Sequence, residues 1–223
     1  MNPDVSPLLR RPDIWLGRQC QPESTGIPSG FASLDRQLAW QGWPPCGVVE
    51  LIGDGHGVLG ITELLLPLFK ARQRGDRWQL LVAPPALPYA PAWADSGIEL
   101  SRLIWVSCEA RKQQLWTLEH SLKSGCCSLI LAWLPSLTAP EARRLQLAAQ
   151  QGETLLLLHL PESVLAQQHA VALRLQLGPQ PQGCTVQLRK QRGGWPTPAI
   201  PLTLPHRPEP EPPRNRSILQ GPW

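Results

Sequence analysis

VVELIGDGHGVLGIT, the stretch from Val48 to Thr62, decides the fold class. It begins with a short apolar run, continues through a glycine-rich turn and leads into a segment, 61–74, that is long enough for a helix. A strand, a glycine turn and a helix in this order form the unit in which many proteins bind phosphate groups at the start of the helix. The stretch therefore predicts an α/β fold with its first candidate site in the turn.

The turn departs from a working phosphate loop at one position. From Gly55 it runs Gly-x-x-x-x-Gly-Ile-Thr, with Gly60, Ile61 and Thr62 at its end, where the Walker A pattern has Gly-Lys-Ser/Thr. Ile61 cannot supply the positive charge that a lysine offers to the β- and γ-phosphates. Thr62 could still bind a magnesium ion, but a carboxylate at a strand end normally helps to hold that ion. The apolar run 129–131 is followed by Ala132 and Trp133, neither of which is acidic. We therefore expect no cofactor and no ATP hydrolysis, while an eroded phosphate loop and an ordinary turn both remain open.

Apolar runs and helical segments alternate along the rest of the chain. The runs that predict strands lie at 78–83, 103–106, 128–133 and 154–158, and the segments that predict helices lie between them, at 91–96, 111–123 and 139–151. Uninterrupted apolar strands separated by helices are typical of a parallel sheet that is covered on both faces. The segments 172–177 and 185–189 alternate apolar and polar residues, which predicts an antiparallel pair at the C-terminal edge.

Proline marks the expected ends of the folded part. The chain has 223 residues and 26 prolines, roughly double the ordinary usage of about 5%, and nine prolines stand within 196–223. Because proline removes backbone donors and disfavours helix, we expect a proline-rich, disordered tail at 196–223, after an N-terminal extension at 1–24 and one α/β domain at 25–195. Ile218, Leu219 and Trp223 are candidate tail anchors for a partner.

Composition excludes several classes of protein. No stretch of about 18 apolar residues predicts a membrane span, and the first residues lack an export signal. None of the six cysteines forms Cys-x-x-Cys or a zinc spacing with histidine, so we expect no metal, reduced cysteines and a cytoplasmic location. The net charge of +4 is mild; the densest basic cluster, Arg189, Lys190 and Arg192, is either a contact for a partner or nucleic acid or a solvated strand end.

Longer motifs resemble a known superfamily. SGFASLDRQL at 29–38 and GWPPCGVVELIG at 42–53 resemble the segment that leads into the core of the RecA recombinases. Further along, the chain resembles the ImuA and SulA relatives of RecA in ITELLLPL at 61–68, RWQL at 77–80, APPALPYAP at 83–91 and RLQLAA at 144–149, and LRKQRGG at 188–194 resembles the ImuA end of that group. The resemblance implies a RecA-like three-layer core, with a mostly parallel sheet, helices on both faces and an antiparallel C-terminal edge.

At the positions matched by this resemblance, the chain lacks the catalytic residues of the superfamily. RecA-type ATPases need the loop lysine, an aspartate at a strand end and a glutamate that activates water. The resemblance places the two lost acidic positions at Ala132 or Trp133 and at Pro85. It therefore implies a protein without catalytic residues that shares the fold of the superfamily but has a different function.

The ImuA resemblance implies a non-catalytic accessory or scaffold protein of SOS-induced, error-prone translesion DNA synthesis, cytoplasmic and associated with the nucleoid when DNA is damaged. The implied partners are an ImuB-like inactive Y-family polymerase, an error-prone replicative polymerase subunit and RecA, through which DNA would be contacted indirectly. Two alternatives stay open. One is a SulA-like inhibitor that binds the tubulin-like cell division protein, supported by the motifs at 61–91, and the other is a RecA-like protein with residual ATP binding.

Overall fold

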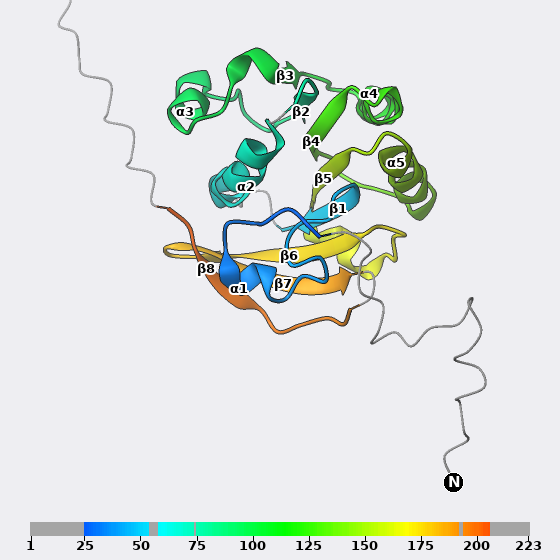
Figure 1. Cartoon of the computed structure of the whole chain (residues 1–223). Coiled ribbons are helices and arrows are strands. Elements are labelled where there is room, and N and C mark those ends of the chain that lie inside the picture. Colours follow the sequence, from blue (N-terminus) through cyan, green and yellow to red (C-terminus); the bar gives the residue numbers. More distant parts are fainter. Residues whose placement is uncertain (1–24, 54–57, 74, 192–193, 206–223) are drawn as a thin grey trace, which may run out of the picture.

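The computed structural model describes residues 25–53, 58–73, 75–191 and 194–205 (Figure 1). Its strands are β1 (Gly47–Ile52), β2 (Trp78–Val82), β3 (Leu103–Val106), β4 (Cys127–Trp133), β5 (Leu155–Leu160), β6 (Leu173–Gln180), β7 (Gly183–Gln191) and β8 (Ile200–Thr203). Its helices are α1 (Ala32–Asp35), α2 (Val58–Arg72), α3 (Ala90–Asp95), α4 (Arg111–Ser124) and α5 (Ala139–Gln151), with 3-10 turns η3 (Leu100–Arg102) and η4 (Glu162–Ala166). No helix in these ranges has the length and apolar character needed to cross a membrane.

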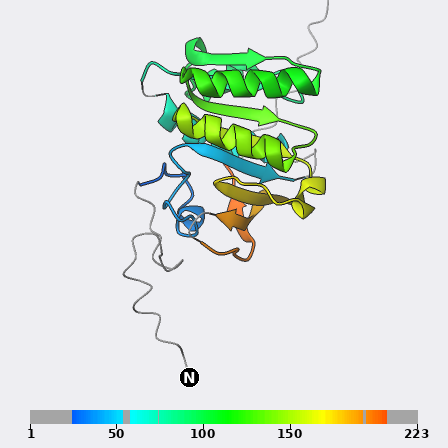
Figure 2. The same ribbon diagram turned by 90° about the vertical axis from the view of Figure 1, so that its right-hand side faces the viewer.

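The strands form one sheet in the order β3-β2-β4-β5-β1-β6-β7-β8. Neighbouring strands from β3 to β6 are parallel, and β7 and β8 join β6 as antiparallel strands. Figure 1 shows α2 and α3 on one face of the sheet and α4 and α5 on the other, and Figure 2 shows α4 and α5 side by side on their face. The predicted α/β class, the mostly parallel sheet and the antiparallel C-terminal edge are confirmed.

Each face of the sheet has its own hydrophobic core, because the central strands are buried on both sides. All six residues of β1 and of β5 are buried. Leu51 of β1 belongs to the core beneath α2 with Leu65 and Phe69, and Val48 belongs to the core beneath α4 and α5 with Leu118. Burying a large aliphatic side chain is worth about 1.5–3 kcal/mol. The uninterrupted apolar runs of the sequence therefore fix the centre of the sheet.

Local signals set the ends of the helices on the second face. Thr138 and Glu141 form a capping box at the start of α5, with proline in the first turn, and α5 spans the predicted 139–151. Helix α4 ends at Gly125, whose φ of 67° lies in the left-handed region that favours glycine. Both predicted helices are confirmed because capping and periodicity agree along these segments.

The C-terminal boundary of the folded part was predicted too early. Strand β8 lies inside the segment 196–223 and pairs with β7, with Pro201 opposite Thr185. Proline cannot donate to a ladder, but β8 is the edge strand of the sheet, where one side of the backbone needs no partner. The folded part therefore continues through Leu204, which is buried. Residues 206–223 lie outside the described residues.

Candidate functional site

The candidate phosphate loop lies between the end of β1 and the first turns of α2. Gly55 is outside the described residues, whereas Gly60, Ile61 and Thr62 belong to α2. Gly60 has a φ of 113°, which residues with a side chain rarely adopt, and its N–H donates to Oε2 of Glu63 at 3.1 Å. A carboxylate repels phosphate and occupies a donor that a bound anion would use. The Gly60 N–H at this helix start therefore already has a hydrogen-bond partner within the chain.

Ile61 stands at the position of the loop lysine, and its side chain is part of the core. It is 2% exposed and belongs to the core beneath α2, with Leu64 and Leu65. A lysine in the same orientation would place its ammonium group among aliphatic side chains, where an unpaired charge is strongly disfavoured. The residue at the position of the loop lysine thus contributes to the packing of the sheet.

The positions at which the resemblance implied lost acidic residues lie at the end of β4 and in the segment after its parallel neighbour β2. Ala132 is fully buried in the core beneath α4 and α5, while Trp133 packs from the other face against the core beneath α2. The Trp133 indole N–H is buried and has no hydrogen-bond partner among the described residues. Pro85 is exposed in the segment after β2. The structure thus brings Ala132 and Trp133 into the packing of the sheet and leaves Pro85 at its surface.

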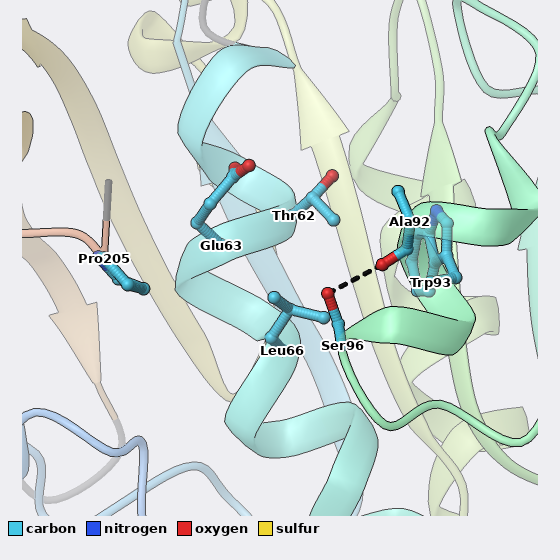
Figure 3. A pocket seen from close by; sticks show the side chains of 7 residues that line it. All are labelled: Thr62, Glu63, Leu66, Ala92, Trp93, Ser96 and Pro205. Atoms are coloured by element: carbon cyan, nitrogen blue, oxygen red, sulfur yellow. Dashed lines mark hydrogen bonds between the residues drawn. The ribbon is translucent and has the colours of Figure 1, made fainter. Parts of the chain in front are cut away.

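A small groove opens between α2 and α3 (Figure 3). Its volume is about 190 Å³, below the roughly 300–1,000 Å³ typical of small-molecule sites. The lining residues are Thr62, Glu63, Leu66, Ala92, Trp93, Ser96 and Pro205. A groove of this size can hold one or two side chains of a protein partner.

The chemistry of the groove suits binding. Trp93 is held edge-on against Phe69, with ring centroids 5.1 Å apart, and the Ser96 hydroxyl donates to the Ala92 carbonyl oxygen at 2.7 Å. Leu66 adds an apolar wall, and the Glu63 carboxylate supplies a negative charge. Among the described residues no group of three His, Cys, Asp or Glu side chains could hold a metal ion. The groove can therefore accept a side chain with an apolar stem and a donor at its end.

The predicted basic cluster lies at the end of β7, and its described members do not converge. Lys190 donates to the His169 carbonyl oxygen at 2.5 Å, and Arg189 donates to Oε1 of Gln187 at 3.4 Å. The β6–β7 register shifts here and leaves Arg189 without an opposite residue, and the two cations bind different parts of the chain. Arg192 and the tail anchors Ile218, Leu219 and Trp223 lie outside the described residues.

Sequence reasoning missed a buried polar cluster on β1. Glu50 is fully buried, and its carboxylate oxygens lie 2.5 Å from Nδ1 of His169 and 2.5 Å from Nε of Arg174. Arg174 stands opposite Glu50 in the β1–β6 register and also donates to the Gln167 and Val164 carbonyl oxygens. The sequence did contain a signal for this cluster, which is a glutamate inside an apolar run. A charged side chain in a strand that is buried on both faces of the sheet requires a partner. The cluster joins β1 to β6 and is remote from the groove lining.

Comparison with known proteins identifies the family. The family model described as cell division inhibitor SulA matches residues 48–156. The cell division inhibitor SulA of Edwardsiella piscicida is 31% identical over 119 residues, which cover 53% of this chain and 71% of that protein. The chain belongs to the SulA family. The SulA protein of Photorhabdus laumondii is 33% identical over 104 residues, which cover 47% of this chain and 59% of that protein.

A solved structure aligns with about half of the chain. The crystal structure of SulA from Pseudomonas aeruginosa aligns with 51% of this chain and 97% of its own length, at 23% identity and a TM-score of 0.44. The SulA match runs from β1 into β5 and contains every groove residue except Pro205. It leaves β6, β7 and β8 outside. The comparisons thus favour the SulA alternative over the ImuA interpretation that the sequence motifs placed first.

Proposed function

We propose that this chain is a non-catalytic cell division inhibitor that binds the tubulin-like division protein. The observation that carries the proposal is membership of the SulA family over the segment that forms the parallel half of the sheet. The site supports it, since Ile61 and Ala132 are buried in the two cores. A chain without a charge clamp or a general base at these positions acts by occupying a partner's surface.

The groove between α2 and α3 is the contact that we assign to this partner. Leu66 and Trp93 give it apolar walls, and Glu63 gives it a negative charge. Rigid aromatic side chains in small pockets supply much of the binding energy in protein interfaces. The partner would insert a lysine or arginine whose stem packs on Trp93 and whose charge meets Glu63.

Expression in a rod-shaped bacterium tests the proposal. The full chain is expected to block division and produce filaments, and Glu63→Lys is expected to restore normal cell length because it places a positive charge against the partner's cation. Asp76→Lys is the matched control: it makes the same change in charge at a fully exposed side chain outside the groove. The proposal is contradicted if cells that express the unmodified chain, at a level confirmed by immunoblot, keep their normal length.

A second candidate function rests on the folded residues outside the SulA match. Residues 157–205 add three strands to the sheet, and they contain the motif at 188–194 that resembles ImuA. We propose, as this second candidate, a RecA-like accessory protein of SOS-induced translesion synthesis that binds an ImuB-like polymerase relative, an error-prone replicative polymerase subunit or RecA. A pull-down from damage-treated cells tests it: recovery of these proteins supports it, and their absence alongside filamentation leaves the division inhibitor.

A further inference from the structure

The C-terminal part of the chain leaves the sheet at the groove between α2 and α3. Leu204 is buried, and its Cδ1 atom lies 3.1 Å from the position that a Cβ atom would occupy at Gly60, near the start of α2. Pro205 is the next residue and lines the groove. Figure 3 shows Pro205 and Trp93 on either side of α2. The segment 206–223, which we call the C-terminal segment, therefore begins at the groove.

Glu63 gives the groove a negative charge that the described part of the chain does not balance. Its Oε2 atom accepts a hydrogen bond from the Gly60 N–H at 3.1 Å, and no lysine or arginine within the described ranges forms an ion pair with it. Arg207 is the second residue after Pro205, and two extended residues span at most about 7 Å. The first arginine of the C-terminal segment therefore starts within reach of this carboxylate.

The proline spacing of the C-terminal segment suits the chemistry of the groove. The segment opens with HRPEPEPP at 206–213, a composition that favours polyproline II, which has three residues per turn. Arg207, Pro210 and Pro213 then share one side, and the two glutamates lie on the other sides. The shared side has a cation and no acid, as a groove with one carboxylate and apolar walls requires. Proline-rich segments dock in aromatic-lined grooves at a low cost in conformational entropy.

We propose that the segment 206–210 of the same chain occupies the groove. The guanidinium of Arg207 lies against the Glu63 carboxylate, and Pro210 packs on Leu66 and Trp93. The segment thus presents the same chemistry, a cation beside an apolar surface, that we assigned to the side chain of the division protein. The occupancy is independent of the proposed function, whereas its consequence, that the chain restrains its own binding site, rests on that function.

The short connection to Pro205 makes even a weak contact effective. A short tether gives an effective concentration of about 1 mM or more. A contact with a dissociation constant of about 1 mM then fills about half of the grooves or more. The apparent dissociation constant of a partner is its intrinsic value divided by the fraction of free grooves, so it rises by about twofold or more.

Carbodiimide coupling of the full chain tests the occupancy without a partner. The reagent activates a carboxylate, which a neighbouring amine attacks to form an amide bond, while the reagent leaves as a urea. In Arg207→Lys the introduced amine is expected to couple to Glu63, and mass spectrometry of mixed isotope-labelled and unlabelled chains should show the link within one chain. Arg216→Lys is the matched control, because it makes the same change further along the C-terminal segment, and it is expected not to couple to Glu63. Absence of the link in Arg207→Lys, equal coupling in both variants, or a link only between two chains would overturn the proposal.

Affinity for the division protein tests the consequence of the occupancy. Arg207→Glu places a second negative charge beside Glu63 and is expected to bind the division protein at least about twofold more tightly than the unmodified chain. Arg216→Glu is expected to bind like the unmodified chain. Equal affinity of Arg207→Glu and the unmodified chain would refute the restraint. If none of the three chains binds the division protein, the proposed function fails, and the coupling experiment alone decides the occupancy.

Discussion

Replacing Ile61 with lysine would complete the phosphate-loop pattern, yet we expect it to destabilise the fold without creating a nucleotide site. Ile61 is 2% exposed in the core beneath α2. Burial of such a side chain contributes about 1.5–3 kcal/mol, and removing one from a core commonly costs about 2–5 kcal/mol. Because the lysine must also lift its ammonium group out of the core, we expect a loss of about 3 kcal/mol or more.

Urea unfolding followed by tryptophan fluorescence measures this loss. With a slope of about 1–3 kcal/mol per molar urea, the midpoint should fall by about 1 M or more. Thr62→Lys is the control, because Thr62 is half-buried at the rim of the groove and a lysine there can reach water. The free energy of unfolding is expected to change by no more than about 1 kcal/mol. The reasoning is refuted if Ile61→Lys is as stable as the unmodified chain and binds ATP with magnesium in a calorimetric titration.

Three further predictions concern the stability of the fold. Glu50→Gln removes the counter-charge of the buried Arg174 and is expected to cost about 3–5 kcal/mol in urea unfolding; a loss below about 1 kcal/mol would contradict the importance of the cluster. The Arg111 guanidinium lowers the pKa of Glu141 from its usual 4.5 to about 2, so this pair stabilises the fold fully above pH 4.5 and its contribution is lost as the pH falls toward 2. Arg111→Ala should therefore flatten the acid limb of a plot of melting temperature against pH, and a limb parallel to that of the unmodified chain would contradict the assignment. Gly152→Ala places a methyl carbon 1.9 Å from a main-chain oxygen of α4 and is expected to cost about 1–3 kcal/mol, again measured in urea, where an unchanged midpoint would show that the two helices can separate freely.

The sequence predicts those parts of the fold in which several local signals agree. Helix α5 follows the prediction to the residue, because Thr138, Glu141 and the apolar spacing all indicate the same start and face. Strand β8 was missed, because Pro201 argues against a strand unless the strand is known to lie at an edge. Which strand lies at an edge depends on the order of the whole sheet, and no local pattern reports that order.

The candidate site is predictable only in part for the same reason. The turn before α2 was located from glycine spacing, and the loss of its lysine was read directly from Ile61. The groove could not be found this way, because it brings together Thr62, Trp93 and Pro205, which are distant in the sequence. Glu50 did carry a local signal, a charge within a run that must be buried, but its partners His169 and Arg174 become evident only from the β1–β6 register.

The residues at the positions that resemble a nucleotide site contribute to the packing of the chain. A nucleotide site needs charged groups that are held in position to bind the ligand. Holding these groups in position lowers the stability of the protein when no ligand is bound. Here Ile61 adds to one core, Ala132 lies in the other, and Glu63 bonds to the Gly60 N–H. The ligand-free chain should then already have its binding-competent form, so its affinity for the proposed partner, the division protein, should be the same with and without magnesium ATP. A several-fold change in affinity, with a partner held in one nucleotide state, would show that the loop still responds to nucleotide.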